Sequence, residues 1–413
     1  MLSSFASSRL APFKNINFSL FFVVRTLSLV GRWSHELARA WLILELTGSS
    51  TWQGAVMLAS AIPITLLILK GGALVDRADA KKIMLVTQFL MGVLVLALAA
   101  FCEWGDISVW HLIVFAVIEG VIISYDSPTF QAVVVRLVDK EDFQQAMAIN
   151  SVNFHTGRML GPVLAGALLT FWGPSLVFFV DAVGFFLVCI VTSFIKVKPQ
   201  KLDSGSKQKL SDLSYFWKKP KMRYQLGQLA LSMVFIFPVF VVVLRTFATK
   251  SFGLDASEFG KLFMFPAMGS VLGSLFFAFW KPKNPLSAVK IGVPFIFIFY
   301  QFLVVSPTWQ VAAAFMCAMG FSSYLMFAAL TVGLQLDVQE SFRGRVSALI
   351  GLAFGSLGPI CSFPVGRFSD FFGEGLSIQL FSSLFLIFSV AWYFWHRSVF
   401  IKNDIKMEID YEI

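Results

Sequence analysis

The chain has 413 residues, of which 57% are hydrophobic, 16% aromatic and only 14% charged. Soluble domains carry about 25% charged residues, so this composition excludes an ordinary soluble protein and predicts one that crosses a membrane many times. The net charge of +9 would suggest a nucleic-acid partner in a soluble chain. In a membrane protein the placement of that charge in particular loops matters more, and we expect lipid as the surroundings and no nucleic acid as a partner.

Twelve apolar runs are long enough to cross a bilayer, whose core requires about 20 apolar residues per helix. The predicted spans are residues 17–45, 52–75, 82–101, 109–136, 145–172, 175–196, 223–250, 257–280, 286–305, 308–336, 344–372 and 375–396. The sequence therefore predicts an all-α integral membrane protein with twelve transmembrane helices. A basic linker at 197–222 separates an N-terminal six-helix half, 1–196, from a C-terminal half, 223–400, which is followed by a tail, 401–413.

Lysine and arginine concentrate in alternate loops. The positive loops contain Arg9, Lys14, Arg77, Lys81, Lys82, Arg136, Lys140, the 197–222 linker, Lys281, Lys283, Arg343 and Arg345. The other loops carry little positive charge, with Lys250 and Lys261 as the main exceptions. Because positively charged loops remain in the cytoplasm, we expect both termini there. The linker lysines should also favour anionic lipid headgroups.

The first span carries a stripe of ionisable side chains. Arg32, His35, Glu36 and Arg39 fall on one face of a helix near mid-membrane. Charge is costly in lipid, so the stripe should face a water-filled cavity or paired charges, and we expect it to act in substrate or proton coupling. The alternative is that Glu36 pairs along its own helix and only stabilises it. A zinc site is rejected because Arg39 stands where a second histidine would be required.

The stretch 72–82 is expected to be a hinge loop between the second and third spans. It contains Gly72, Asp76, Arg77, Lys81 and Lys82. A glycine at a helix end allows a neighbouring helix to approach closely. The pattern Gly-x-Leu-x-Asp-Arg-x-x-x-Lys-Lys resembles the loop between helices two and three of major facilitator superfamily transporters, which implies that Asp76 and Arg77 hold one conformational state. The alternative is a loop that only fixes topology.

Two further stretches narrow the resemblance. Residues 40–49, Ala-Trp-Leu-Ile-Leu-Glu-Leu-Thr-Gly-Ser, and residues 141–151 are similar to the branch that holds bacterial enterobactin exporters and related drug exporters. The similarity covers nearly the whole chain. It implies the major facilitator fold, with two pseudo-symmetric six-helix halves, in the bacterial cytoplasmic (inner) membrane. It also implies that Arg136 belongs to the conformational gate and contacts Asp76.

The fourth span places Glu119 and Asp126 seven residues apart on one helix face. A carboxyl group removed from water can exchange protons near neutral pH, so both acids are candidate proton carriers. The alternative is that each pairs with an arginine of the first or fifth span. The superfamily's arginine four residues before a glycine is missing, because Ala116 precedes Gly120. Which residue couples protons therefore stays open.

The fifth span combines small residues with a proline: Gly157, Gly161, Pro162 and Gly166. This spacing allows tight helix contact, and the proline can bend the helix there. The run resembles the fifth-span signature of antiporters in the superfamily. The alternative is a packing face without directional meaning. The Leu-Gly-Pro of 160–162 recurs at 357–359, an offset of 197 residues, as two related halves would produce.

Two other residues of the fifth span, His155 and Arg158, are expected to face the cavity. Arg158 is predicted to pair with Asp126 or to bind an anion. Asp181 of the sixth span is expected to lie near the membrane surface. In the second half, Arg245 of the seventh span is the main candidate for the cavity wall.

These features predict a secondary exporter that works by alternating access and exchanges protons for a small organic molecule. The cargo stays open between a siderophore and an amphipathic drug, although the arginines of the spans favour an anion. The rival functions are a proton-coupled uptake symporter or metabolite facilitator and, from another class, a membrane enzyme. No catalytic motif or metal-ligand spacing is found, so we expect no catalytic residue, cofactor or metal, the proton gradient as energy source, and a monomer.

Overall fold

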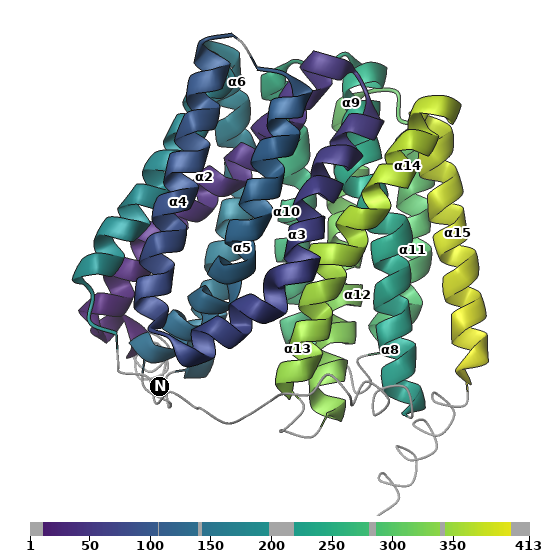
Figure 1. Ribbon diagram of the computed structural model, residues 1–413. Coiled ribbons are helices and arrows are strands. Elements are labelled where there is room, and N and C mark those ends of the chain that lie inside the picture. Colours follow the sequence, from purple (N-terminus) through teal and green to yellow (C-terminus); the bar gives the residue numbers. More distant parts are fainter. Residues whose placement is uncertain are drawn as a thin grey trace, which may run out of the picture.

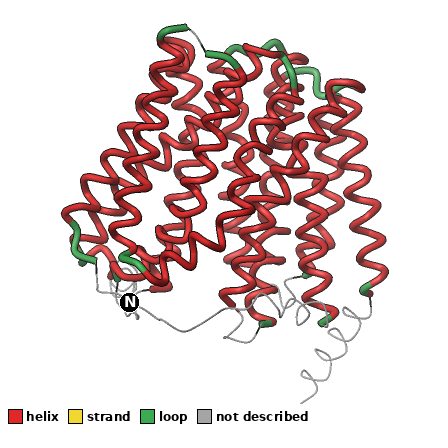
Figure 2. Tube along the Cα trace, in the orientation of Figure 1, coloured by secondary structure: helices red, strands yellow, loops and turns green. Residues whose placement is uncertain are grey.

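The computed structural model describes residues 11–105, 107–138, 143–197, 219–280, 286–338 and 343–397. These residues form a bundle of helices joined by short loops at its two ends (Figures 1 and 2). The first long helix begins, and the last one ends, at the same end of the bundle (Figure 1). We call this the terminal end and the opposite one the distal end.

The N-terminal half consists of a 3₁₀ turn and five helices. They are η1 (Ala11–Lys14), α2 (Ile16–Thr47), α3 (Ser50–Arg77), α4 (Ala80–Glu103), α5 (Val109–Leu137) and α6 (Phe143–Phe194). The chain reverses inside α6 at Gly173, whose φ of 75° is a backbone conformation that favours glycine. Before the reversal the chain runs parallel to α2, because Gly157 and Gly161 meet successive turns of α2 in the same order. After it the chain runs antiparallel, because Asp181 and Gly184 meet α2 in the reverse order. The helix α6 is thus two antiparallel limbs.

The C-terminal half begins with a helix interrupted by two π-helical turns. Its elements are α8 (Pro220–Leu231), η4 (Ser232–Ile236), η5 (Val239–Val243), α9 (Leu244–Phe252), α10 (Ala256–Trp280), α11 (Ser287–Val304), α12 (Trp309–Asp337), α13 (Arg343–Leu352), η7 (Ala353–Leu357), α14 (Gly358–Phe372) and α15 (Glu374–Trp395). π-Helical turns inside α-helices often occur at functional sites. Arg245 follows one of them directly, at the start of α9.

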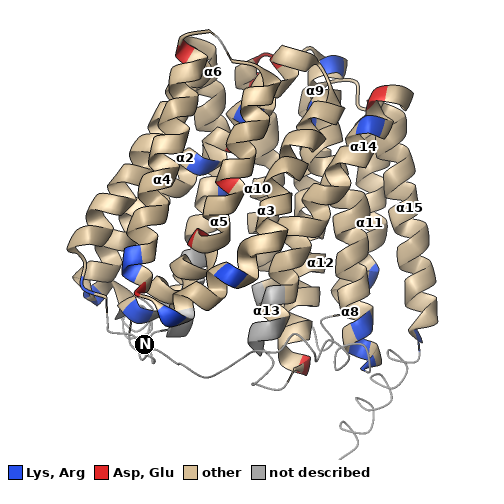
Figure 3. Ribbon diagram, viewed as in Figure 1, with Lys and Arg blue, Asp and Glu red and all other residues tan. Residues whose placement is uncertain are grey.

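Each predicted span agrees with the observed helices to within three residues. Ten segments of the described chain are long and apolar enough to cross a membrane, and one of them, Asn153–Phe194, contains the reversal at Gly173. The helix α2 is not among the ten, and its centre carries the charged stripe. Figure 3 shows that most of the bundle surface in this view lacks charge and that Lys and Arg gather mainly toward the ends.

The repeated Leu-Gly-Pro motif occupies corresponding places in the two halves. A Cβ atom at Gly161 would lie 2.5 Å from Trp33 Cβ in α2, the first long helix of its half. A Cβ at Gly358 would lie 2.6 Å from the ring of Phe237, in the first span of the other half. Both glycines therefore let the helix that contains them pack closely on the first helix of the same half.

The two halves meet along α3 with α14 and along α6 with α10. A Cβ at Gly54 would lie 2.4 Å from the carbonyl oxygen of Ser362, and one at Gly166 would lie 2.8 Å from that of Ala256. At the distal end, the carboxylate of Asp370 in α14 accepts the backbone N–H groups of Ser50 (2.8 Å) and Thr51 (2.9 Å) at the start of α3. It also accepts the hydroxyl of the N-cap residue Ser49.

Candidate functional site

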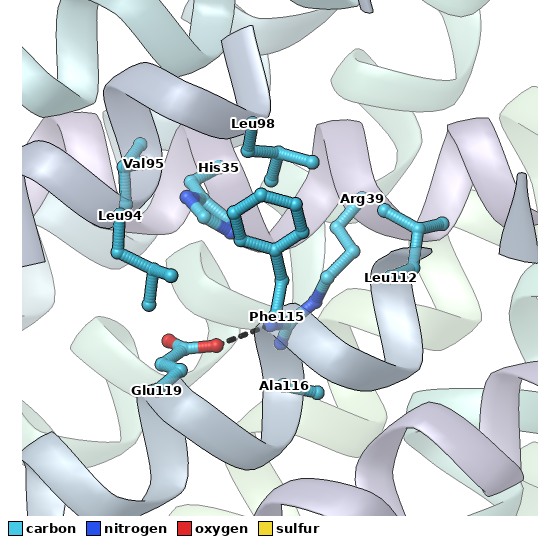
Figure 4. A pocket seen from close by; sticks show the side chains of 9 residues that line it. All are labelled: His35, Arg39, Leu94, Val95, Leu98, Leu112, Phe115, Ala116 and Glu119. Carbon is cyan, nitrogen blue, oxygen red and sulfur yellow. Dashed lines mark hydrogen bonds and ion pairs between the residues drawn. The ribbon is translucent and has the colours of Figure 1, made fainter. Parts of the chain in front are cut away.

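Four charged side chains of α2 and α5 form a balanced network inside the N-terminal half. Glu119 accepts Arg32 Nη2 at its Oε1 atom (3.1 Å) and Arg39 Nη1 at its Oε2 atom (2.6 Å). Arg39 Nη2 also donates to Glu36 Oε2 at 2.7 Å. Figure 4 shows Arg39 and Glu119 meeting among apolar side chains of α4 and α5. Two carboxylates and two guanidinium groups leave this network neutral.

The sequence left open whether Glu36 and Glu119 are unpaired functional groups or form ion pairs, and the network contains ion pairs for both. Glu36 pairs with an arginine of its own helix, and Glu119 pairs with arginines of the first span. The stripe lies on one face of α2, as its spacing predicts. Glu119, which joins Arg32 and Arg39, comes from α5, and the spacing within α2 could not predict it. A role in substrate or proton coupling remains a prediction for these four residues.

His35, in the same stripe, points to a different partner. Its Nδ1 atom lies 2.9 Å from Asp181 Oδ2, and its ring packs edge-on against Phe178 with centroids 4.9 Å apart. Asp181 is only 1% exposed and lies against Gly31, at the middle of α2, so the expectation that it lies near the membrane surface is wrong. The reversal of α6 brings Asp181 against α2 at Gly31, where a Cβ would lie 3.1 Å from Asp181 Oδ1. The available signal was a lone acid in an otherwise apolar helix.

Asp126 forms a hydrogen-bonded link between α5 and α4. Its Oδ1 atom accepts the hydroxyl of Thr87 and the amide of Gln88, both at 2.7 Å. The predicted pairing with Arg158 is therefore wrong, because Asp126 faces α4, whereas Arg158 lies on α6 with its guanidinium 6.0 Å from the ring of Trp33.

Arg158 and Arg245 come from opposite halves and share one property. Within the described part of the chain, neither forms an ion pair. The Arg245 guanidinium lies 5.9 Å from the centre of the Phe263 ring, and its buried Nε atom has no hydrogen-bond partner among the described residues. The charges of Glu36 and Arg39 in the other half act electrostatically on Arg245.

His155 of α6 contacts the other half through its ring, which lies 5.7 Å from that of Tyr324 in α12. Its buried Nδ1 atom has no hydrogen-bond partner in the described structure. Both His155 and Arg158 thus lie on the limb of α6 that approaches the C-terminal half, three residues apart.

The stretch 72–82 is mostly helical, so the loop predicted over all of it is wrong in its extent, whereas its hinge role remains a prediction. The helix α3 continues to Arg77 and α4 begins at Ala80, so the connection is two residues long. Nothing lies within 4 Å of a Cβ placed at Gly72. The close contact occurs one residue earlier, where a Cβ at Gly71 would lie 2.0 Å from the carbonyl oxygen of Ser124.

The other residues predicted to form the conformational gate are Asp76, Arg77, Lys81, Lys82 and Arg136. The side chain of Asp76 lies outside the described residues, so its contact with Arg136 remains a prediction. Arg77 and Lys82 are exposed and Arg136 is half-buried. Lys81 Nζ donates to the carbonyl oxygens of Ser193 (2.9 Å) and Ile195 (2.8 Å) at the end of α6, within its own half.

The small residues of α6 make the close contacts that their spacing predicts. Gly157 and Gly161 meet α2, whereas Gly166 meets α10 of the other half. A Cβ at Gly260 would lie 2.4 Å from the carbonyl oxygen of Pro162. The antiporter meaning of this signature remains a prediction. In the described residues, no group of three or more His, Cys, Asp or Glu side chains is placed to hold a metal ion.

Comparison with known proteins gives consistent relatives. A family model described as transmembrane secretion effector matches residues 7–397. A staphyloferrin A transporter of Staphylococcus aureus is 22% identical over 395 residues, which cover 93% of this chain and 97% of the relative. An enterobactin exporter of Salmonella choleraesuis is 22% identical over 313 residues, 74% of each chain.

Solved structures share the fold. A bacterial homologue of the human lysosomal transporter Spinster, in an inward-facing and occupied conformation, has a TM-score of 0.73 and 18% identity, with 95% of this chain and 98% of that chain covered. A bacterial homologue of the iron transporter ferroportin, in an inward-facing state, has a TM-score of 0.69 and 17% identity, with 91% and 98% covered.

Proposed function

Because the chain belongs to the transmembrane secretion effector family of major facilitator superfamily transporters, we propose that it exports a small anionic molecule of the siderophore class in exchange for protons. The protein is an integral membrane transporter and not an enzyme. The proposal includes twelve membrane crossings, counting α2 and both limbs of α6, in a bacterial inner membrane with both termini in the cytoplasm. A monomer without a cofactor would use the proton gradient.

The observation that carries the cargo class is that Arg158 and Arg245, one from each half, have no ion-pair partner among the described residues. Arg32 and Arg39 are neutralised by Glu119 and Glu36, so they contribute little net positive charge. Arg158 lies on α6 of the N-terminal half and Arg245 on α9 of the C-terminal half, and guanidinium groups bind carboxylates through paired, charge-assisted hydrogen bonds. An anion held between the halves would bias their relative position, which is the requirement for alternating access.

The relatives support a siderophore as the anion. Two of them are named for transport of staphyloferrin A and for export of enterobactin. The direction is tested in iron-limited cultures of the source bacterium with and without the gene, in which siderophores are measured in cells and medium by mass spectrometry. Export predicts that a siderophore accumulates inside the deletion strain. Retention in the medium instead would indicate uptake, and an unchanged distribution would contradict siderophore transport.

Substitution of the two arginines tests the cargo-binding groups. Arg158→Gln and Arg245→Gln should each lower siderophore export by about tenfold or more, because a hydrogen bond to a charged group contributes about 1.5–3 kcal/mol. Lys261→Gln is the matched control, because it removes one positive charge from an exposed position on α10. Export is measured per amount of protein in the membrane. Wild-type rates in both arginine variants would contradict an anion-binding role.

A further inference from the structure

We propose that the proton of this transporter is carried by the pair His35–Asp181, between α2 and the second limb of α6. The proton would enter and leave at His35 Nε2, through a small cavity that His35 shares with Glu119. This inference rests on the proposed proton coupling and names its site. It moves that role away from Glu36, Glu119 and Asp126.

The other candidate proton carriers of this half, Glu36, Glu119 and Asp126, already have hydrogen-bond or ion-pair partners. Glu119 binds two guanidinium groups and Glu36 binds one. Protonating Glu119 would sacrifice two ion pairs and leave two arginines with one carboxylate, which is costly away from water. Asp126 accepts two hydrogen bonds at one oxygen. Each of these acids is therefore already bound by hydrogen bonds or ion pairs to neighbouring side chains.

The His35–Asp181 pair, in contrast, keeps one polar atom of each side chain without a partner among the described residues. A carboxylate can only accept, so the 2.9 Å contact assigns the Nδ1 proton of His35 as the donor to Asp181 Oδ2. The His35 Nε2 and Asp181 Oδ1 atoms are buried and have no hydrogen-bond partner among the described residues. The side chains are 6% and 1% exposed. Imidazole changes charge around physiological pH, and its free Nε2 lone pair is the acceptor that a proton requires.

A small cavity lies between His35 of this pair and two members of the charge network, Arg39 and Glu119. Its volume is about 10 Å³, which is close to the space that one water molecule needs. The polar side chains that line it belong to His35, Arg39 and Glu119. The remaining walls are apolar: Leu94, Val95, Leu98, Leu112, Phe115 and Ala116 (Figure 4). A hydronium ion delivered through it would form the Nε2–H bond and leave water, and release would reverse this step, while the Nδ1 proton stays on the Asp181 side.

The charged groups around the pair provide the coupling. The Coulomb fields of Arg25 and Arg32 on α2 reach Asp181, so the carboxylate keeps positive neighbours when His35 is neutral. The field of His35 reaches Glu36 on α2 and Glu119 on α5. Arg39 lines the cavity. The described parts of α4 and of the second limb of α6 place no other charged side chain in it. A proton on His35 would therefore add a positive charge that competes electrostatically with Arg32 and Arg39 for the Glu119 carboxylate.

That competition reaches the C-terminal half, because Glu36 and Arg39 act electrostatically on Arg245. Protonation of His35 would thus change the charge balance between the halves where the anion is proposed to bind. Coupling requires only that proton and cargo bias the two conformations differently.

The first test requires no cargo. The chain has four histidines, so ¹⁵N-histidine NMR of the protein in lipid nanodiscs resolves few signals. His111→Gln, His155→Gln and His396→Gln assign His35 by elimination while it remains intact. The expected result is a change of His35 with pH from the Nδ1–H tautomer to the doubly protonated ring, displaced in Asp181→Asn but not in the control Asp337→Asn. A His35 signal that stays constant while the protein remains folded would overturn the proposal.

The second test links the proton to conformation. Spin labels at Glu45 and Phe371, exposed positions on opposite halves near the distal end, report the distance between the halves as pH changes. The pH response should be lost in His35→Gln and Asp181→Asn and retained in His111→Gln. A wild-type response that both variants retain would overturn the site but not the coupling. A wild-type protein without any response would refute the proposed coupling, while the NMR titration still decides whether the pair binds a proton.

Discussion

At the scale of single residues, one carboxylate organises the charged centre of the N-terminal half. Glu119 bonds to two arginines of α2, and one of these also bonds to Glu36. Glu119 is 7% exposed, whereas the Glu36 side chain is 29% exposed. The two acids therefore differ in how much unpaired buried charge remains when each is removed. Removing the buried one leaves two guanidinium groups competing for a single partner.

We expect Glu119→Gln to lower the free energy of unfolding by about 3–5 kcal/mol, because it leaves an uncompensated buried charge. Glu36→Gln should cost about 1 kcal/mol or less, since its pair is more exposed to solvent. Denaturant or thermal unfolding in detergent measures both. In the double variant Arg39→Gln/Glu119→Gln the loss should be smaller than the sum of the single losses. Equal losses for Glu119→Gln and Glu36→Gln would contradict this account.

At the scale of helices, close approach depends on which face a glycine occupies. Gly71 and Gly72 are neighbours near the end of α3, yet only the first faces α5. Neighbouring positions on a helix point about 100° apart, so one glycine lies in the helix contact and the other does not. The sequence pattern cannot tell which of the two faces the contact, because it does not contain the rotation of α3 about its axis.

The two positions should respond oppositely to alanine. Gly71→Ala places a Cβ 2.0 Å from a backbone oxygen of α5, and the resulting shift of backbone should cost at least about 1–3 kcal/mol. Gly72→Ala meets nothing within 4 Å and should stabilise the helix by about 0.5–1 kcal/mol, because alanine loses less conformational entropy on folding. Apparent Tm values in detergent compare the two. A stabilising Gly71→Ala would show that α3 and α5 are farther apart.

At the scale of the whole molecule, the two halves are joined at the distal end by hydrogen bonds between the Asp370 carboxylate and the N-terminus of α3. Asp370 of α14 accepts two backbone N–H groups of α3 and the Ser49 hydroxyl. The N-terminus of a helix carries partial positive charge, so an acid there is stabilising. The contact joins helices whose sequence separation exceeds 300 residues, and it must break if the distal end is to open.

We expect Asp370→Asn to weaken this contact by about 1 kcal/mol, roughly fivefold in the equilibrium between joined and separated distal ends. The Glu45–Phe371 spin-label distances should shift toward longer values in that variant. Asp255→Asn is the matched control, because Asp255 lies at the same end and accepts the N–H of Glu258 within its own half. Unchanged distances in Asp370→Asn would show that the other contacts of α3 with α14 suffice to hold the distal ends together.

The sequence by itself determined the helices and the close contacts made by the glycines of α6. Run length and small-residue spacing are local properties of the chain, so all predicted spans coincide with helices and the glycines of α6 meet their neighbours. The same holds for the charged stripe of α2, because helical periodicity alone places its members on one face.

Only the tertiary structure decided which groups meet. Asp126 bonds to Thr87 and Gln88 instead of Arg158, and Asp181 lies against His35 at the middle of α2 instead of near the membrane surface. A partner on another helix depends on the rotation and depth of both helices in the bundle, and for Asp181 on the reversal at Gly173. These quantities are set by the packing of the whole molecule, so no local pattern contains them.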